Sequence, residues 1–233
     1  MLYCQPSCSF TAMDPQSAKW IREYAIQKGM KVRACCHFDK NALEDEDTGL
    51  YFCQECRNVM EGQSFHTKSL WQFIDEDPSF VFPDYAGSEY VLIDCWRDRE
   101  HPEIHSAVRS LLKKMNIRVT EPEKNRENTD FCGTLHFETE RYRDEVTSFD
   151  HLSHFGKEME KKLMEEKVSQ LRGMSAITYC CRCYKGIITG GGHPVHLMSL
   201  LAGGDENHLN EVEDRTIEIM KKPDPRYAMK NMR

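Results

Sequence analysis

The chain has 233 residues, 39% of them hydrophobic, which is enough for one large domain or two small ones. Its formal charge is −7 and its basic residues are scattered, which disfavours nucleic acid as the main partner because that role usually needs a basic face. We find neither the pattern of a signal peptide nor an apolar run long enough for a membrane helix. We therefore expect a cytoplasmic protein without a membrane span.

Cysteine is unusually frequent, with 11 residues in the chain. In the reducing cytosol, clustered cysteines more often bind metal or take part in redox chemistry than form a disulfide framework. The odd count also argues against complete pairing. The cysteines therefore predict a metal or redox site.

The first elements are predicted from a cysteine, a proline and a glycine. Cys8 is followed by Pro15, which fits the first turn of a helix, and helical periodicity then continues to Gly29, a residue suited to a helix end. The short strand "MKV" comes next. The adjacent pair Cys35 and Cys36 then precedes a second strand, "GLYF".

The strand "GLYF" ends at a C-x-x-C pair, Cys53 and Cys56, and a helix follows. We assign residues 1–84 to a first repeat, in which Cys4 is a spare cysteine. His37, directly after the adjacent cysteines, can tune a cluster potential or protonate a leaving thiolate, because imidazole titrates near neutrality.

The same order recurs in a second repeat over residues 85–204. With a shift of 87 residues Cys8 falls on Cys95 and Pro15 on Pro102, and the strand "YVLID" ends where Cys95 begins. With a shift of 127 residues the first C-x-x-C falls on Cys180 and Cys183, which follow the strand "SAITY". The matching cysteines and the repeated C-x-x-C pattern favour duplication over coincidence.

The second repeat differs from the first in three places. "FCG", with Cys132 at its centre, stands where the first repeat has "CCH", so Phe131 replaces one cysteine. A polar loop (121–130) and a charged amphipathic helix (155–173) make the second repeat longer. Residues 205–233 are predicted to form a polar C-terminal tail, loosely ordered at its end.

Strands that alternate with helices predict an α/β fold, here two pseudo-symmetric repeats with short parallel sheets flanked by helices. Sites in such sheets form at the carboxyl ends of the strands. The leading cysteine and the C-x-x-C pair both follow strands in each repeat. We therefore expect the thiols of one repeat to converge.

The number of thiols differs between the repeats. A tetrahedral zinc site and a [4Fe–4S] cubane each take four cysteines. The first repeat offers five: Cys8, Cys35, Cys36, Cys53 and Cys56. The second offers four, Cys95, Cys132, Cys180 and Cys183, which suit zinc or an ordinary cluster. Cys181 is extra, and could supply the ligand that Phe131 lacks.

These motifs resemble the cysteine-rich "CCG" domain family, which includes the CCG-domain subunit of heterodisulfide reductase, glycolate oxidase iron–sulfur subunits and the membrane-anchor subunit of certain succinate dehydrogenases. The resemblance covers residues 1–204 and is clearest in "VLIDCWRDREHPEIHSAVRSLLKKMNIRV", "DFCGT" and "AITYCCRCYKGIITGGGHPVHLMSLLAG". The chain departs from the family in the short spacers and the His37 of its first repeat, and in Phe131 of its second.

The resemblance implies a cofactor and an activity. In heterodisulfide reductase, five cysteines of this domain hold a non-cubane [4Fe–4S] cluster that receives electrons and cleaves a disulfide, and in other members one copy holds structural zinc. Carried over, the cofactor-binding residues are Cys8, Cys35, Cys36, Cys53 and Cys56. We predict Cys35 and Cys36, together with the neighbouring His37 that the family lacks, as the catalytic group. Cys95, Cys132, Cys180 and Cys183 then form a metal site for a [4Fe–4S] cluster or zinc.

We therefore expect an oxidoreductase subunit of the heterodisulfide reductase type. It would exchange electrons with iron–sulfur or flavoprotein subunits and act on a disulfide or thiol substrate. A non-catalytic electron-transfer or zinc-stabilised interaction module in a larger complex is the alternative. A thioredoxin-like site is disfavoured because "CQEC" and "CCRC" lack the usual flanking residues.

Two further motifs have ordinary explanations. His66 and His193 match at the shift of 127 residues, and such histidines are more often caps or core residues than ligands. "GGGHP" lacks the pattern of a phosphate-binding loop, so we expect a tight turn or a close backbone approach there.

Overall fold

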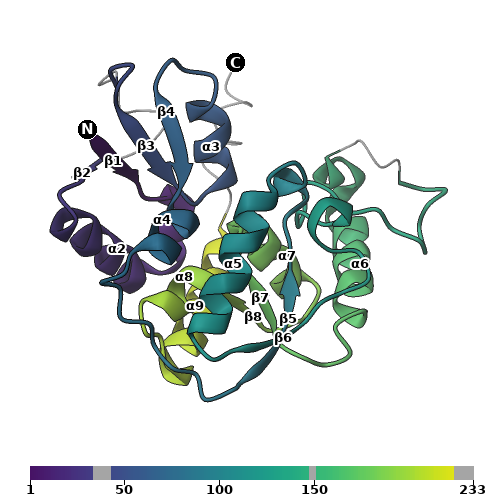
Figure 1. Cartoon of the computed structure of the whole chain (residues 1–233). Coiled ribbons are helices and arrows are strands. Elements are labelled where there is room, and N and C mark those ends of the chain that lie inside the picture. The colour runs from purple at the N-terminus through teal and green to yellow at the C-terminus, as the bar shows by residue number, and fades with distance from the viewer. Residues whose placement is uncertain (34–42, 147–150, 223–233) are drawn as a thin grey trace.

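A computed structural model describes residues 1–33, 43–146 and 151–222, and Figure 1 shows them as two α/β halves packed against each other. The first half contains one four-stranded sheet with flanking helices. Its elements are β1 (Leu2–Gln5), α1 (Cys8–Met13), α2 (Pro15–Gln27), β2 (Lys31–Val32), β3 (Thr48–Tyr51), α3 (Gln54–Met60), β4 (His66–Ser69) and α4 (Leu70–Glu76).

The second half repeats this arrangement and adds a long helix before its third strand. Its strands and α-helices are β5 (Glu89–Ile93), α5 (Pro102–Lys114), β6 (Arg118–Thr120), α6 (Gly156–Ser169), β7 (Ala176–Thr178), α7 (Cys181–Thr189), β8 (Pro194–His196) and α8 (Leu197–Leu201). Three short 3₁₀ turns are η1 (Trp96–Asp98), η2 (Arg126–Asn128) and η3 (Leu152–Phe155). The C-terminal region then forms α9 (Glu206–Lys221).

Both sheets are entirely parallel and share one topology. The strand order is β2-β1-β3-β4 in the first and β6-β5-β7-β8 in the second. The chain therefore reverses direction across the sheet between β1 and β3, and again between β5 and β7. Such a reversal leaves a crevice at the carboxyl ends of the two central strands, where ligands bind in open α/β sheets.

Individual positions confirm the predicted repeat. Pro15 and Pro102 each occupy the first turn of a helix, α2 and α5. Both helices are followed by a residue in the left-handed region, Gly29 at φ 73° and Asn116 at φ 55°. Asparagine is among the few residues that tolerate this conformation, so it can take the place of the glycine.

The second half of each repeat matches in strand register as well. Gly49 pairs with Thr67 across β3 and β4, and Ala176 pairs with Pro194 across β7 and β8. Both pairs are related by the shift of 127 residues that aligns the C-x-x-C motifs. The predicted fold class, α/β with two pseudo-symmetric repeats, is confirmed.

Apolar packing and hydrogen bonds join the two halves. Helices α4 and α5 lie against each other, and the Ser199 hydroxyl of α8 donates a hydrogen bond of 2.6 Å to Asp14 in the first half. Helix α9 returns to the first half, where Arg215 donates to the carbonyl of Ala12 at 2.9 Å (Figure 1). No helix in the described ranges is both long and apolar enough to cross a membrane.

The charged segment predicted as a helix over 155–173 forms α6, which begins and ends within that range. Leu163 and Leu171 of the predicted apolar stripe are buried, and Phe155, Met159 and Val168 pack against the core. The other side of α6 is exposed and carries charged pairs such as Lys161 with Glu165, at 3.4 Å.

Candidate metal centre

Four cysteine thiols of the second repeat converge on one point. The Sγ atoms of Cys95, Cys132, Cys180 and Cys183 all lie within 4.8 Å of one another, and all four residues are buried. The Sγ atoms of Cys95 and Cys132 are 3.5 Å apart. The structure thus brings together the four residues predicted as a metal site.

The sheet topology explains this convergence. Cys95 is the second residue after β5 and Cys180 the second after β7, and these are the two strands at the reversal of the sheet. Cys180 also precedes the first turn of α7, which contains Cys183. Three thiols therefore come from adjacent strand ends, where the chain is held on both sides by the sheet and the helix.

The fourth thiol is brought in by a loop that packs closely on α7. Cys132 lies in the segment between β6 and α6, and its amide donates to the carbonyl of His136 at 2.8 Å. Gly133 follows with φ 53°, and a β-carbon at this position would lie 2.0 Å from the carbonyl oxygen of Arg182. The glycine of "FCG" is therefore required for the loop to approach the C-x-x-C turn.

Phe131 does not extend the ligand set. Its ring is buried and makes an edge-to-face contact with Phe137, with ring centres 5.9 Å apart. Its carbonyl accepts a hydrogen bond from the amide of Trp96 at 2.9 Å and faces the Cys183 thiol at 3.8 Å. The position that holds a cysteine in the first repeat thus serves core packing in the second.

Asp94 and Tyr179 brace the strand ends that carry the ligands. The Tyr179 hydroxyl donates to Asp94 Oδ1 at 3.1 Å and accepts from the amide of Cys95 at 3.2 Å. Asp94 is also paired with both terminal nitrogens of Arg109, at 2.7 and 3.2 Å. Each bracing residue immediately precedes a ligand in the sequence, and this adjacency is the signal that could have identified them.

The four thiols favour a bound cation. Hydrogen bonds from the other three thiols, that of Cys132 foremost, hold the pKa of Cys180 well below its ordinary value. Burial raises the pKa of Cys95 and of Cys183, so these thiols resist losing their protons without a positive partner. A divalent metal supplies that partner, because it binds thiolates and displaces their protons.

The spacing of the sulfurs fits a single ion. Four thiolates at about 2.3 Å from a zinc ion lie about 3.8 Å from one another in a tetrahedron. The measured limit of 4.8 Å leaves room for this arrangement with small adjustments. A cubane places four irons and four sulfides between the same sulfurs and spreads them further apart. The four thiols therefore form a donor set that could hold a metal ion or an iron–sulfur cluster.

The described thiols of the first repeat occupy equivalent places; Cys56 is buried, but the other two are more open. Cys8, at the start of α1, is exposed, and Cys53, which precedes α3, is half-buried. A hydrogen bond from Cys56 lowers the pKa of Cys53 to about 6. Within the described ranges, the four thiols of the second repeat are the one group of three or more potential ligands close enough to hold an ion.

The predicted catalytic group, Cys35, Cys36 and His37, lies outside the described residues. The five-cysteine site predicted for the first repeat is therefore represented by Cys8, Cys53 and Cys56 alone.

The remaining described cysteines belong to the core. Cys4 is buried in β1, where burial raises the pKa of its thiol to about 12. Cys181 is also buried, and its Sγ lies 4.0 Å from Nε2 of His196, outside the four-thiol group. His196 accepts at Nδ1 from the amide of Met198, so its Nε2–H is directed at the Cys181 sulfur.

The matching histidines lie at the surface. His66 is exposed at the start of β4, and His193 is exposed with its Nδ1 3.1 Å from Glu213. The glycines of "GGGHP" form the expected tight turn with Gly191 at φ 79°. A β-carbon on Gly190 would lie 2.3 Å from the carbonyl of Met164 in α6, so the close backbone approach is to that helix.

Two ion pairs cross between the repeats beside the cysteines, and sequence reasoning missed both. Arg57, after Cys56, pairs with the buried Asp98. Arg97, two residues after Cys95, pairs with Glu55 at 2.9 Å. Burial by itself would lower the pKa of Arg97, but the nearby thiols of Cys132 and Cys180 and the Glu55 carboxylate raise it above its ordinary value. The C-x-x-C helix of one repeat therefore contacts the leading-cysteine turn of the other.

A scan against protein-family models and searches of curated proteins and solved structures found no match to this chain. The resemblance to the CCG family therefore rests on the cysteine motifs and the segments around them.

Proposed function

We propose that the protein is a metal–thiolate oxidoreductase subunit in which the second repeat holds a structural metal ion and the first repeat holds the redox centre. The observation that carries this proposal is the difference between the two sets of thiols. Those of the second repeat are four in number and buried, whereas Cys8 and Cys53 of the first are reached by solvent.

The proposed ion of the second repeat is zinc. Structural zinc sites are closed, with four protein ligands and no open position, and Cys95, Cys132, Cys180 and Cys183 supply such a set. Zinc has no redox chemistry, so this ion would stabilise the folded state. It would do so by linking the ends of β5 and β7 to the 121–146 segment.

The proposed redox centre is an iron–sulfur cluster held by Cys8, Cys35, Cys36, Cys53 and Cys56. Support comes from the resemblance to the CCG-domain subunit of heterodisulfide reductase, the equivalent strand-end positions of Cys8 and Cys53, and the lowered pKa of Cys53, since thiolates are the ligands of such clusters. The cluster would supply electrons one at a time. Iron–sulfur or flavoprotein subunits are the proposed donors.

The proposed substrate is a disulfide. Two electrons and two protons convert one disulfide into two thiols, breaking a single S–S bond. His37, next to the cysteine pair, is the proposed source of a proton for the leaving thiolate, because imidazole titrates near neutrality.

The test is metal and sulfide analysis of the anaerobically purified full chain, with Cys132→Ser and Cys53→Ser beside it and Cys4→Ser as the control. We expect the wild type to contain about one zinc in addition to iron and acid-labile sulfide. Cys132→Ser should lose the zinc and keep the iron, Cys53→Ser should do the opposite, and Cys4→Ser should keep both. Zinc at both sites without sulfide would contradict the redox proposal.

The alternative, a zinc-stabilised interaction module, is favoured by the crossed ion pairs. The pairs Arg57–Asp98 and Arg97–Glu55 bind the two cysteine-bearing regions to each other, as a purely structural role would require. A colourless protein that contains zinc and no sulfide, and that gives no EPR signal after reduction, would establish this alternative.

A further inference from the structure

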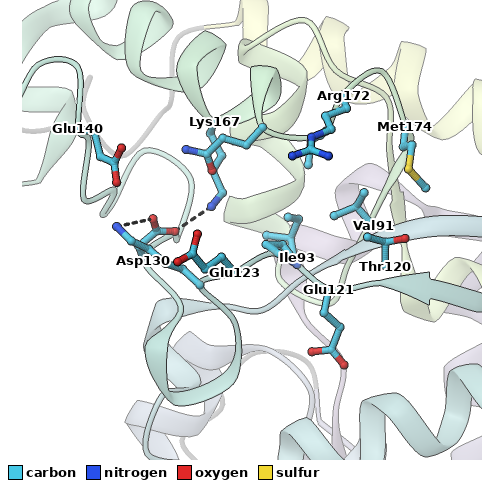
Figure 2. Close-up of a pocket in the computed structure, with 14 residues that line it drawn as sticks. Val91, Ile93, Thr120, Glu121, Glu123, Asp130, Glu140, Lys167, Arg172 and Met174 are labelled. Carbon is cyan, nitrogen blue, oxygen red and sulfur yellow. Dashed lines mark hydrogen bonds and ion pairs between the residues drawn. The ribbon is translucent and has the colours of Figure 1, made fainter.

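A cavity of about 430 Å³ lies in the second repeat, away from the cysteines, between β5, the loop after β6 and the end of α6 (Figure 2). Most of its lining comes from the two stretches that the first repeat lacks, the 121–130 loop and the 155–173 segment. The extra length of the second repeat thus supplies most of the lining of this cavity. A volume of this size suits a small molecule.

The floor of the cavity is apolar. Val91 and Ile93 point into it from alternate positions of β5, and Leu171 and Met174 close it from the segment after α6. These side chains offer a surface for a branched or thioether side chain of a ligand, since burial of apolar area is favourable.

One wall of the cavity contains a buried ion pair whose charges neutralise each other without a ligand. Lys167 and Asp130 each have a side-chain exposure of 2%, and Nζ lies 2.8 Å from Oδ1 (Figure 2). Lys124 approaches the other oxygen of Asp130 at 3.3 Å. Glu121 is likewise paired, with Arg109 at 2.6 Å. These charges satisfy one another and rigidify the wall.

Three charges at the cavity remain without a partner. Within the described part of the chain, the side chains of Arg172, Glu123 and Glu140 make no hydrogen bond or ion pair, although all three line the cavity at its exposed rim. Figure 2 shows Arg172 entering from the α6 side and Glu123 from the loop side. A guanidinium binds a carboxylate through two parallel hydrogen bonds, and a carboxylate accepts from an ammonium group.

We propose that this cavity binds a small zwitterion with an apolar side chain, of the size of a free α-amino acid such as leucine or methionine. The carboxylate of the ligand pairs with Arg172, its ammonium group pairs with Glu123, and its side chain packs on Val91 and Ile93. This inference is independent of the metal assigned to either repeat, because no cysteine lines the cavity.

The test is calorimetric titration of the full chain with three probes: L-leucine, leucinamide, which lacks the carboxylate, and N-acetylleucine, which lacks the ammonium group. We expect leucine to bind more tightly than both derivatives. Arg172→Gln should weaken leucine about tenfold and leave leucinamide unchanged, because one charged hydrogen-bonded contact is lost. Glu123→Gln should weaken leucine similarly and leave N-acetylleucine unchanged.

Glu127→Gln, on the same loop but outside the lining, and Arg143→Gln, an exposed arginine outside it, are the matched controls. Both should bind leucine as the wild type does. Absence of leucine binding to the wild type overturns the proposal. So does a loss in Arg172→Gln that is equal for leucine and leucinamide, because the arginine would then not contact the carboxylate.

Discussion

The Cα atom of Gly133 lies 2.6 Å from the position that a β-carbon would occupy at Gly186. Gly133 belongs to the loop that carries Cys132, and Gly186 belongs to α7, which carries Cys183. The loop and the helix can approach this closely because neither residue has a side chain. The contact holds two of the four ligands in place.

Gly186→Ala should therefore destabilise the protein by about 1–3 kcal/mol, since an added methyl group would overpack this contact. The direction of this change in stability is informative, because alanine in the interior of a helix is otherwise more stable than glycine by about 0.5–1 kcal/mol. Urea unfolding measures the change. Gly62→Ala is the control, since nothing lies within 4 Å of a β-carbon there. A Gly186→Ala variant as stable as the wild type would contradict the close contact.

Cys132→Ser should lower the zinc content by about one equivalent, because a hydroxyl is a much poorer zinc ligand than a thiolate. Thermal unfolding of this variant should no longer respond to a chelator. Cys181→Ser is the matched control, since Cys181 is a further buried cysteine, in α7, and lies outside the four-thiol group. Equal zinc loss from both variants would show that Cys181 is a ligand.

Tyr179→Phe should weaken metal binding about tenfold, in the range found for groups that orient metal ligands. The variant removes the hydroxyl that joins Asp94 to the amide of Cys95. Competition with a chromophoric chelator measures the affinity. Tyr184→Phe, a buried tyrosine of α7 whose hydroxyl makes no hydrogen bond in the described ranges, should leave the affinity unchanged. A similar loss in both variants would reject the bracing role.

Changes at Cys35 and Cys36 test the proposed redox centre. Cys35→Ser or Cys36→Ser should alter the EPR signal of the reduced protein, because each replaces a proposed cluster ligand, while Cys4→Ser should leave the signal as it is. If the Cys4 variant changed the signal as much as Cys8→Ser, Cys4 rather than Cys8 would be the leading ligand.

The stability of the protein should decrease below about pH 4, partly through Asp14. Burial alone would raise the pKa of this carboxyl, but hydrogen bonds from Ser17 and Ser199 and the charge of His208 lower it below its ordinary value of 3.8. A lowered folded-state pKa stabilises the protein above the unfolded value, and this contribution is lost as the pH falls through the folded one.

Asp14→Asn should therefore reduce stability by about 1 kcal/mol at neutral pH, because the new amide nitrogen cannot accept the hydrogen bond that Ser199 donates to Oδ2, and should flatten the acid dependence. Urea unfolding at a series of pH values measures both effects. Asp144→Asn, at an exposed position, controls for the loss of one carboxylate. An acid dependence as steep in Asp14→Asn as in the wild type would refute the assignment.

The fold and the four-thiol group were predictable because both depend on local patterns. Pro15 and Pro102 each lie in the first turn of a helix, a position that proline favours. A C-x-x-C motif that follows a strand places its thiols at the edge of the sheet. Two matching shifts along the chain then sufficed to align the repeats. The four ligands stand at positions where the first repeat also has cysteines.

Contacts between the repeats could not be predicted in the same way. Arg57 and Asp98 are 41 positions apart, and nothing in either motif indicates that the two meet. The cavity is likewise built from the 121–130 loop and the end of α6, which the comparison of the repeats shows merely as added length. The role of Phe131 in the core depends on Phe137 and Lys167, which come from separate segments.

A hydrogen bond and an ion pair at Asp98 connect the two halves of the chain. Its carboxylate is 1% exposed and accepts from two side chains of α3, Gln54 at 2.7 Å and Arg57. A fragment that contained the second repeat alone would lose both of these donors, and one that contained the first repeat alone would leave the buried Arg57 without its carboxylate partner. Although the chain reads as two copies of one unit, each copy supplies the partner of a buried charge in the other.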